Sequence, residues 1–247
     1  MLKTKAEVAK MRRAGRVVAE MLDECTKAAL PGVTTADLDL IAREVLVRRD
    51  AKSNFLDYHG FPAVICTSPN EVIVHGIPGP YVLRDGDILS IDCGAIIEGW
   101  HADAARTIPI GSVTDEAERL IEATRESLMA GVDHVRKGSR ISDIGHAVQA
   151  VAESQGFHVV REYVGHGIGT AMHEEPQVPN YGDPGRGLKL KVGHVLAVEP
   201  MVNAGTTRTK LFEDGWTVLT LDGRLSAHFE HSIAVTDNGP EVLTSSD

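Results

Sequence analysis

The stretch at 89–107, LSIDCGAIIEGWHADAART, constrains the fold most, because it has the pattern of a β-hairpin that carries two aspartates. If Glu98-Gly99 forms a two-residue turn, Asp92 and Asp103 lie on one face as diagonal neighbours, roughly 7–8 Å apart at the backbone. An ionised carboxylate without a partner in this apolar setting would cost several kcal/mol, and no Lys or Arg flanks Asp92 on its strand. The hairpin therefore lacks a balancing positive charge, and we hypothesise that a bound metal ion provides this charge.

Length and composition limit the classes of protein to which the chain can belong. Its 247 residues contain no Pro-, Ser- or charge-rich linker, which predicts one domain over residues 1–247. Cys25, Cys66 and Cys93 form neither a disulfide framework nor a CxxC zinc site, and the first residues lack a signal-peptide apolar region. No apolar run approaches the roughly 20 residues that span a bilayer. The net charge of −10 argues against a nucleic-acid surface. Together, these features lead us to expect a cytoplasmic protein without membrane or nucleic-acid partners.

Apolar residues at helical spacing predict two pairs of helices, and strands follow each pair. A capping box at Thr4 and Glu7 marks the first helix start. The expected helix limits are Thr4 to about Pro31-Gly32, Thr34 or Thr35 onward, Asp115 to about Arg136 and Ser142 to about Ser154, with early strands at Ala63–Thr67 and Val72–His75.

The second helix pair repeats the pattern of the first. A shift of 106 residues aligns Gly32 with Gly138 and Asp37 with Asp143. Two helix pairs, each followed by antiparallel strands, predict a pseudo-twofold α+β fold with a central cleft. The two halves would cover about residues 4–110 and 111–247.

Three further titratable residues occur in unusual surroundings. His166 lies in GHGIG, a Gly-rich segment that lets the backbone approach closely, while Glu199 and Glu230 each lie in an apolar run with strand character. Taken singly, a structural role is the commoner explanation for each. Four acids in strand settings poor in bases would be costly together unless they share a multivalent cation.

Four carboxylates and one imidazole suit a pair of divalent ions about 3.5–4 Å apart. Oxygen-rich ligation favours Mn or Fe(II), while Co and Zn stay open. Other chemical motifs are missing from the sequence. HEEPQ at 173–177 lacks the second His of HExxH and contains a Pro, and neither GxSxG nor GxxxxGK[ST] occurs.

Several motifs together resemble the type I methionine aminopeptidases. They are VHGIP at 74–78, GHGIG at 165–169, HEEPQV at 173–178, EPMV at 199–202 and DGWTV at 214–218. The similarity covers nearly the whole chain, and the chain lacks a type II insertion and a zinc-finger extension, as in the minimal bacterial form. The resemblance implies the pita-bread fold and removal of the initiator methionine from nascent proteins and peptides when the second residue is small.

The resemblance also implies a role for each candidate metal ligand. Asp92 would be the bidentate ligand of one ion, and His166 and Glu199 would be ligands of the other. Asp103 and Glu230 would bridge the two ions.

A mechanism follows from the same resemblance. A hydroxide that bridges the two ions would attack the first peptide carbonyl. His173 would donate a hydrogen bond to the developing oxyanion, His75 would contact the scissile amide, and Glu199 would carry a proton to the leaving amine. Without the resemblance, His75 and His173 would be ordinary surface or cleft residues.

The resemblance places further candidates around the substrate. A methionine pocket would be lined by Tyr58, Phe61, Cys66, Met172 and Trp216, although Phe61 and Cys66 fit an ordinary core equally well. Met172 stands where family members often have Phe, Ala102 and Ala104 bracket Asp103 where HGDT is usual, and Pro69 interrupts a SINE stretch.

Asn70 and Ser226 match positions that help to hold a monovalent cation in the family, and a turn role is the alternative. We expect a monomer that contacts the ribosome transiently.

Two other functions compete with this one. A proline-directed peptidase would share the fold and the ligands, but such enzymes usually carry an extra N-terminal domain that we do not expect here. A non-catalytic binding module of the same fold would typically have lost ligands, whereas all five are present.

Overall fold

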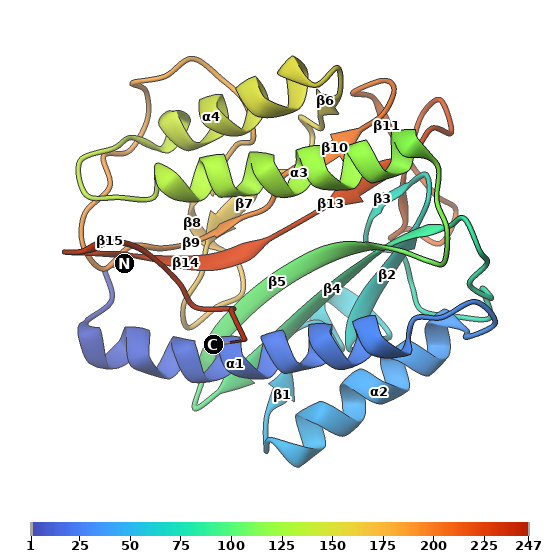
Figure 1. Cartoon of the computed structure of the whole chain (residues 1–247). Coiled ribbons are helices and arrows are strands. Elements are labelled where there is room, and N and C mark those ends of the chain that lie inside the picture. Colours follow the sequence, from blue (N-terminus) through green and yellow to red (C-terminus); the bar gives the residue numbers. More distant parts are fainter. Residues whose placement is uncertain (1, 247) are drawn as a thin grey trace.

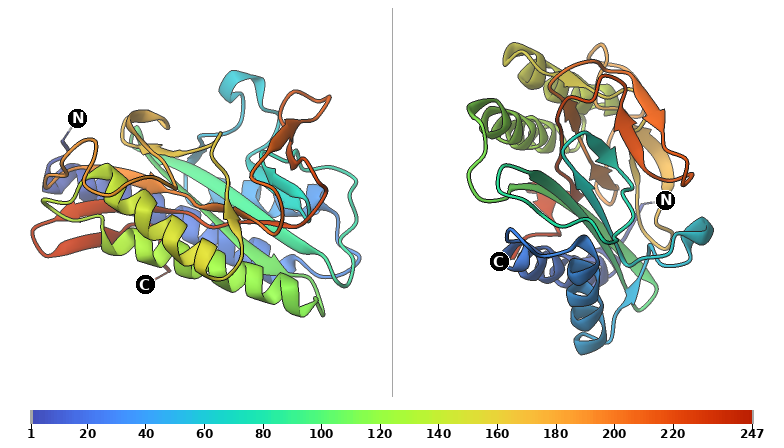
Figure 2. Two further views of the ribbon diagram at one scale, coloured as in Figure 1. Left: turned by 90° about the horizontal axis from the view of Figure 1, so that it is seen from above. Right: turned by 90° about the vertical axis from the view of Figure 1, so that its right-hand side faces the viewer.

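The structure is a computed structural model and describes residues 2–246; Met1 and Asp247 lie outside the described part. The helices are α1 (Lys5–Ala28), α2 (Thr35–Arg48), α3 (Asp115–Asp133) and α4 (Ile141–Ser154), with a short 3-10 helix at Tyr58–Gly60. In the view of Figure 1, helices α3 and α4 lie above the antiparallel strands and α1 and α2 lie below them. In the two views of Figure 2 the helices lie mainly on one side of the strands, and long loops project from the other.

The first strands form a sheet in which β4 (Ile88–Ile97) pairs with β1 (Lys52–Ser53), β2 (Ile65–Pro69) and β5 (Trp100–Pro109). A five-stranded sheet has the order β15-β14-β9-β7-β8. Two three-stranded sheets have the orders β13-β10-β6 and β11-β12-β3. The remaining strands are β3 (Val72–Val74), β6 (His158–Val159), β7 (Gly165–Gly167), β8 (Glu174–Val178), β9 (Val195–Val198), β10 (Met201–Asn203), β11 (Thr209–Leu211), β12 (Val218–Thr220), β13 (Ser226–His228), β14 (His231–Thr236) and β15 (Gly239–Val242).

The predicted helices are confirmed, with small differences at their ends. Thr4 and Glu7 form the capping box of α1, and Thr34 begins α2 with a second box. Helix α3 ends at Asp133, three residues before the expected limit, and α4 begins one residue early at Ile141. Strand β2 begins two residues later than expected, at Ile65.

The backbone supports the predicted internal repeat. Gly32 and Gly138 have left-handed φ values of 96° and 98°, and each donates its N–H to a carbonyl oxygen of a later loop. An isolated β-bridge follows at equivalent places, joining Thr34 to Val82 in one half and Arg140 to Lys189 in the other. In each helix pair, the second helix therefore follows the same turn and the same isolated bridge.

The hairpin has the predicted register. Glu98 and Gly99 form the two-residue turn, with positive φ values of 50° and 78°. Asp92 pairs with Ala105, and Asp103 pairs with Gly94, so both carboxylates leave the same face. The opposite face packs in the first hydrophobic core, against α1 and α2.

We predict that Gly15→Ala destabilises the protein, although Ala favours a helix by about 1 kcal/mol over Gly. A Cβ atom at Gly15 in α1 would lie 2.0 Å from the carbonyl oxygen of Leu243, so the C-terminal segment would have to move. We expect the free energy of unfolding, measured in urea, to fall by about 1–2 kcal/mol. The neighbouring exposed Arg16→Ala should change it by less than about 0.5 kcal/mol. A more stable Gly15→Ala protein would contradict this packing.

Candidate metal centre

All twelve predicted site residues line one cavity of about 170 Å³. They come from both halves of the chain. Their roles remain predictions, but their proximity is a property of the fold. The lining consists of Tyr58, Phe61, Cys66, His75, Asp92, Asp103, His166, Met172, His173, Glu199, Trp216 and Glu230, together with Phe55.

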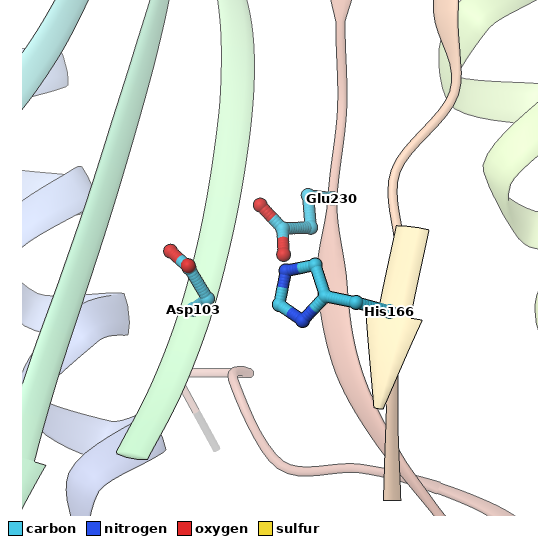
Figure 3. A group of neighbouring side chains, drawn as sticks. All are labelled: Asp103, His166 and Glu230. Carbon is cyan, nitrogen blue, oxygen red and sulfur yellow. The ribbon is translucent and has the colours of Figure 1, made fainter. Parts of the chain in front are cut away.

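Three of these residues form a group that could hold a metal ion. One ligand atom from each of Asp103, His166 and Glu230 lies within 4.8 Å of the other two, and all three residues are buried. Figure 3 shows the three side chains converging from separate strands and loops. Asp92 and Glu199 line the same cavity, and one Glu199 oxygen lies 3.5 Å from Nε2 of His166.

The acidic side chains in this cavity lack cationic partners within residues 2–246, since no Lys or Arg lines it. One oxygen each of Asp92, Asp103 and Glu230 is buried without a hydrogen-bond partner. Such atoms are costly unless something binds them. Divalent ions of the kind that carboxylates and imidazole bind would satisfy them, so the residues present fit a metal centre.

Burial and mutual repulsion also raise the pKa values of these acids. Burial raises the pKa of Asp92 to about 7. Burial, with repulsion from Glu230 and Asp92, raises the pKa of Asp103 well above its usual value. The pKa values of Glu199 and Glu230 are raised for the same reasons. A bound cation would reverse this shift, because it stabilises the ionised form.

Glu199 and Glu230 are presented differently from our expectation of continuous apolar strands. Glu199 lies in the break between β9 and β10, where Pro200 has no N–H to continue the ladder. Glu230 lies between β13 and β14, and its backbone exchanges two hydrogen bonds with Ala105 of β5. The two acids are therefore aimed by interruptions of the strands.

His166, by contrast, lies within a strand. It is the middle residue of β7, which pairs with β8 and β9. The expected close approach is present, since a Cβ atom at Gly165 would lie 2.3 Å from the carbonyl oxygen of Ala197. At Gly167 the corresponding distance to the carbonyl oxygen of Glu175 is also 2.3 Å. The glycines thus let three strands pack tightly around the imidazole.

The two other predicted histidines stand at the edge of this acidic group. The ring of His173 is centred 4.3 Å from that of His166, and the hydroxyl of Tyr58 lies 2.7 Å from its Nδ1. His75 has a left-handed φ of 61°, which is uncommon outside glycine. Burial lowers the pKa of His75 to about 4 and also lowers the pKa of His173, so both imidazoles are neutral at pH 7.

The predicted methionine-pocket residues form an apolar cluster beside the acids. Phe61 lies edge-on to Trp216, with ring centres 5.1 Å apart, and Cys66 and Met172 belong to the same cluster. Cys66 pairs directly with Asp92 across β2 and β4. Cys66 of the apolar cluster and Asp92 of the acidic group are therefore neighbours in one sheet.

Two residues near the site were missed by sequence reasoning. Phe55 lines the cavity edge-on to Phe61; it departs from a common pattern of the family, but we did not place it among the pocket candidates. His228 is fully buried, with Nε2 unpartnered in residues 2–246 and 3.8 Å from Glu199. Its signal was available in the sequence, because HFEH is a polar sequence inside an apolar strand region.

Asn70 and Ser226 are adjacent, as the suggested monovalent-cation site requires. The backbone N–H of Ser226 donates to the carbonyl oxygen of Asn70. The Asn70 side chain donates to Tyr81 and Asp87. Both residues have complete structural roles, and cation binding there stays a prediction.

Comparison with known proteins agrees with this geometry. Residues 9–237 match the model of metallopeptidase family M24. Methionine aminopeptidase of Clostridium acetobutylicum is 53% identical over 245 residues, which covers 99% of this chain and 98% of that protein. The chain belongs to family M24, among the methionine aminopeptidases.

Two solved methionine aminopeptidase structures have the same fold. That from Thermotoga maritima superimposes with a TM-score of 0.98 at 43% identity, and that from Rickettsia prowazekii with 0.97 at 44%. Each comparison covers 99% of both chains. The fold is therefore the α+β pita-bread fold of M24 metallopeptidases, as predicted. No helix among residues 2–246 combines the length and apolarity needed to cross a membrane.

We predict that Mn²⁺ raises the unfolding temperature of EDTA-treated protein, because a ligand that binds only the folded state stabilises it. Glu230→Gln should lose most of this shift and bind less metal in elemental analysis. Glu118→Gln, an exposed acid of α3, is the matched control and should bind metal as the wild type does. Equal metal content in all three proteins would contradict a ligand role for Glu230.

Proposed function

We propose that this chain removes the N-terminal methionine from nascent proteins and peptides whose second residue is small. The observation that carries the proposal is the direct pairing of Cys66 with Asp92, which sets an apolar side-chain pocket against an acidic metal cavity. Such a cavity can hold the first side chain of a peptide while its first amide lies at the metal centre.

Metal binding would involve five residues. Asp92 would hold one ion, His166 and Glu199 the other, and Asp103 and Glu230 both. A pair of divalent ions supplies, when bound, the activation of water that peptide hydrolysis needs at neutral pH. Mn, Fe(II), Co and Zn are all compatible with this donor set.

His173 and His75 would act on the substrate itself. His173 is neutral, and its Nδ1 is paired with the hydroxyl of Tyr58 at 2.7 Å, which leaves Nε2 free to donate to the developing oxyanion. His75 projects into the cavity from the strained residue that follows β3 and would contact the scissile amide. Both assignments are supported by the position of these rings beside the acids.

Glu199 would transfer the proton that the leaving amine requires. Its two oxygens lie 3.5 Å from Nε2 of His166 and 3.8 Å from Nε2 of His228. The side chain is 15% exposed, so it reaches the cavity while most of it is buried. A carboxylate at this position, open to the cavity beside the other acids, could accept a proton and return it to the leaving amine.

Selectivity for methionine would come from the apolar cluster. A thioether packs favourably against aromatic edges and a thiol. Phe61 and Trp216 present such edges, and Cys66 and Met172 add sulfur to the walls. A small second residue would fit the remaining space near His75.

We further propose that the protein acts in the cytoplasm as a monomer and contacts the ribosome transiently. The proposal is supported by the methionine aminopeptidase relatives and by a composition without a disulfide framework. Sedimentation with translating ribosomes would test the contact.

We predict that metal-reconstituted protein releases methionine from Met-Ala-Ser but not from Met-Leu-Ser, because the second side chain must be small. Ala-Pro peptides should stay intact. Cleavage of Ala-Pro would instead assign the chain to the proline-directed peptidases. Absence of turnover with any of the four metals would favour a binding module.

We predict that His173→Ala lowers kcat about 10²–10³-fold, the usual effect of losing one oxyanion donor. The metal content should not change, because His173 is not among the proposed ligands. His134→Ala, an exposed histidine at the end of α3, is the matched control and should be fully active. Loss of metal in His173→Ala would show that its role is wrongly assigned.

A further inference from the structure

A lysine near the start of the chain is buried beside the proposed active site. The Lys3 side chain is 5% exposed, and its Nζ lies 2.7 Å from Oε2 of Glu174, a residue 171 positions away. The backbone N–H of Lys3 donates to the carbonyl oxygen of Gly193 at 2.7 Å. Lysine is rarely buried to this degree, so the pairing with Glu174 needs an explanation.

The surroundings of Lys3 form a fitted slot. A Cβ atom at Gly169 would lie 2.5 Å from Cε of Lys3. A Cβ atom at Gly193 would lie 2.5 Å from the carbonyl oxygen of Lys3. Two glycines from different segments thus allow the lysine to pass between them, and its ammonium group reaches Glu174.

Glu174 in turn holds the loop that precedes it. Its Oε1 accepts hydrogen bonds from the backbone N–H groups of Thr170 at 2.8 Å and Ala171 at 3.3 Å. Its Oε2 accepts from Lys3. One carboxylate therefore closes the loop at 170–174, and the positive charge that balances it comes from Lys3.

This loop carries two residues of the cavity. Met172 belongs to the apolar cluster, and His173 contacts the ring of His166 and the hydroxyl of Tyr58. His173 is joined directly to Glu174, so any shift of Glu174 moves the imidazole. The contacts lead from Lys3 to Glu174 and from there to His173.

We propose that Lys3 is a positioning residue for the proposed reaction, acting through Glu174 to hold His173 at the metal centre; this inference rests on the proposed function. Without the ammonium group, a carboxylate that is 17% exposed would keep only neutral donors, the backbone N–H groups of Thr170 and Ala171 and the Thr170 hydroxyl at 3.5 Å, and would turn toward water. Displacing a catalytic group by about 1 Å can reduce the rate on the order of 10²-fold.

The first test compares Lys3→Met with Lys5→Met in the full chain. Lys5 is exposed, two residues away, and has no partner among the ion pairs of residues 2–246, so it is the matched control. We expect Lys3→Met to lower kcat for Met-Ala-Ser about 10–100-fold with unchanged metal content, and Lys5→Met to stay within about twofold. Lys3→Arg, which keeps the charge, should recover part of the loss. A Lys3→Met enzyme within twofold of wild type, or one whose loss follows lost metal, would overturn the proposal.

Two double-mutant cycles test the route of the effect. Lys3→Met should cost less than about threefold when added to Glu174→Gln, and the same when added to His173→Ala. An undiminished cost in either background would mean that Lys3 does not act through that residue. The Lys3→Met/Glu174→Gln protein buries no unpaired charge, so its kcat can be compared directly with that of the wild type even if Lys3→Met alone folds poorly; an unchanged kcat there would overturn the proposal.

A spectroscopic measurement separates this inference from the proposed function. In ¹⁵N-histidine NMR spectra, the His173 ring signal, assigned by its absence in His173→Ala, should shift in Lys3→Met and not in Lys5→Met. An unchanged signal would overturn the positioning role. If the wild type releases no methionine from any peptide, the proposed function fails while this spectrum still tests the contact.

Discussion

The structure depends on the burial of four carboxylates in one cavity. Asp92 and Asp103 come from the hairpin of the first half, while Glu199 and Glu230 come from the second. Within residues 2–246 no Lys or Arg lines the space between them, so the raised pKa values reflect desolvation and repulsion that a bound cation would relieve. A metal ion bound there would be held by carboxylates from both halves of the chain.

Backbone and hydroxyl hydrogen bonds hold the halves in register around that centre. Glu230 and Ala105 exchange both backbone hydrogen bonds, at 2.9 and 3.3 Å. The Ser232 hydroxyl accepts from the N–H of Asp103 and donates to its carbonyl oxygen, both at 2.9 Å. These contacts fix the backbone of Asp103 and Glu230 independently of their carboxylates, so that both side chains leave toward the same cavity.

The hairpin could be predicted from sequence because its two faces are needed for different purposes. Ile91, Cys93 and Ala95 pack in the helical core, while Asp92 and Asp103 on the opposite face line the cavity. A slip of one residue would bury the acids against the helices, so the pattern admits one register. The same parity explains why Ala102 and Ala104 can depart from the family pattern: both are fully buried in the helical core, on the face away from the cavity.

Residues outside such periodic patterns were harder to predict, for a physical reason. Glu199 and Glu230 owe their direction to breaks in the strands, and alternation says nothing about where a side chain points at a break. The contact between Lys3 and Glu174 joins residues 171 positions apart in the sequence, and no local spacing encodes it. The helices and the hairpin follow from periodicity, whereas the final aim of the acids and of His173 follows from non-local contacts. Periodicity therefore positions the two acids of the hairpin, whereas contacts between distant segments position Glu230 through Ala105 and the loop at 170–174 through Lys3.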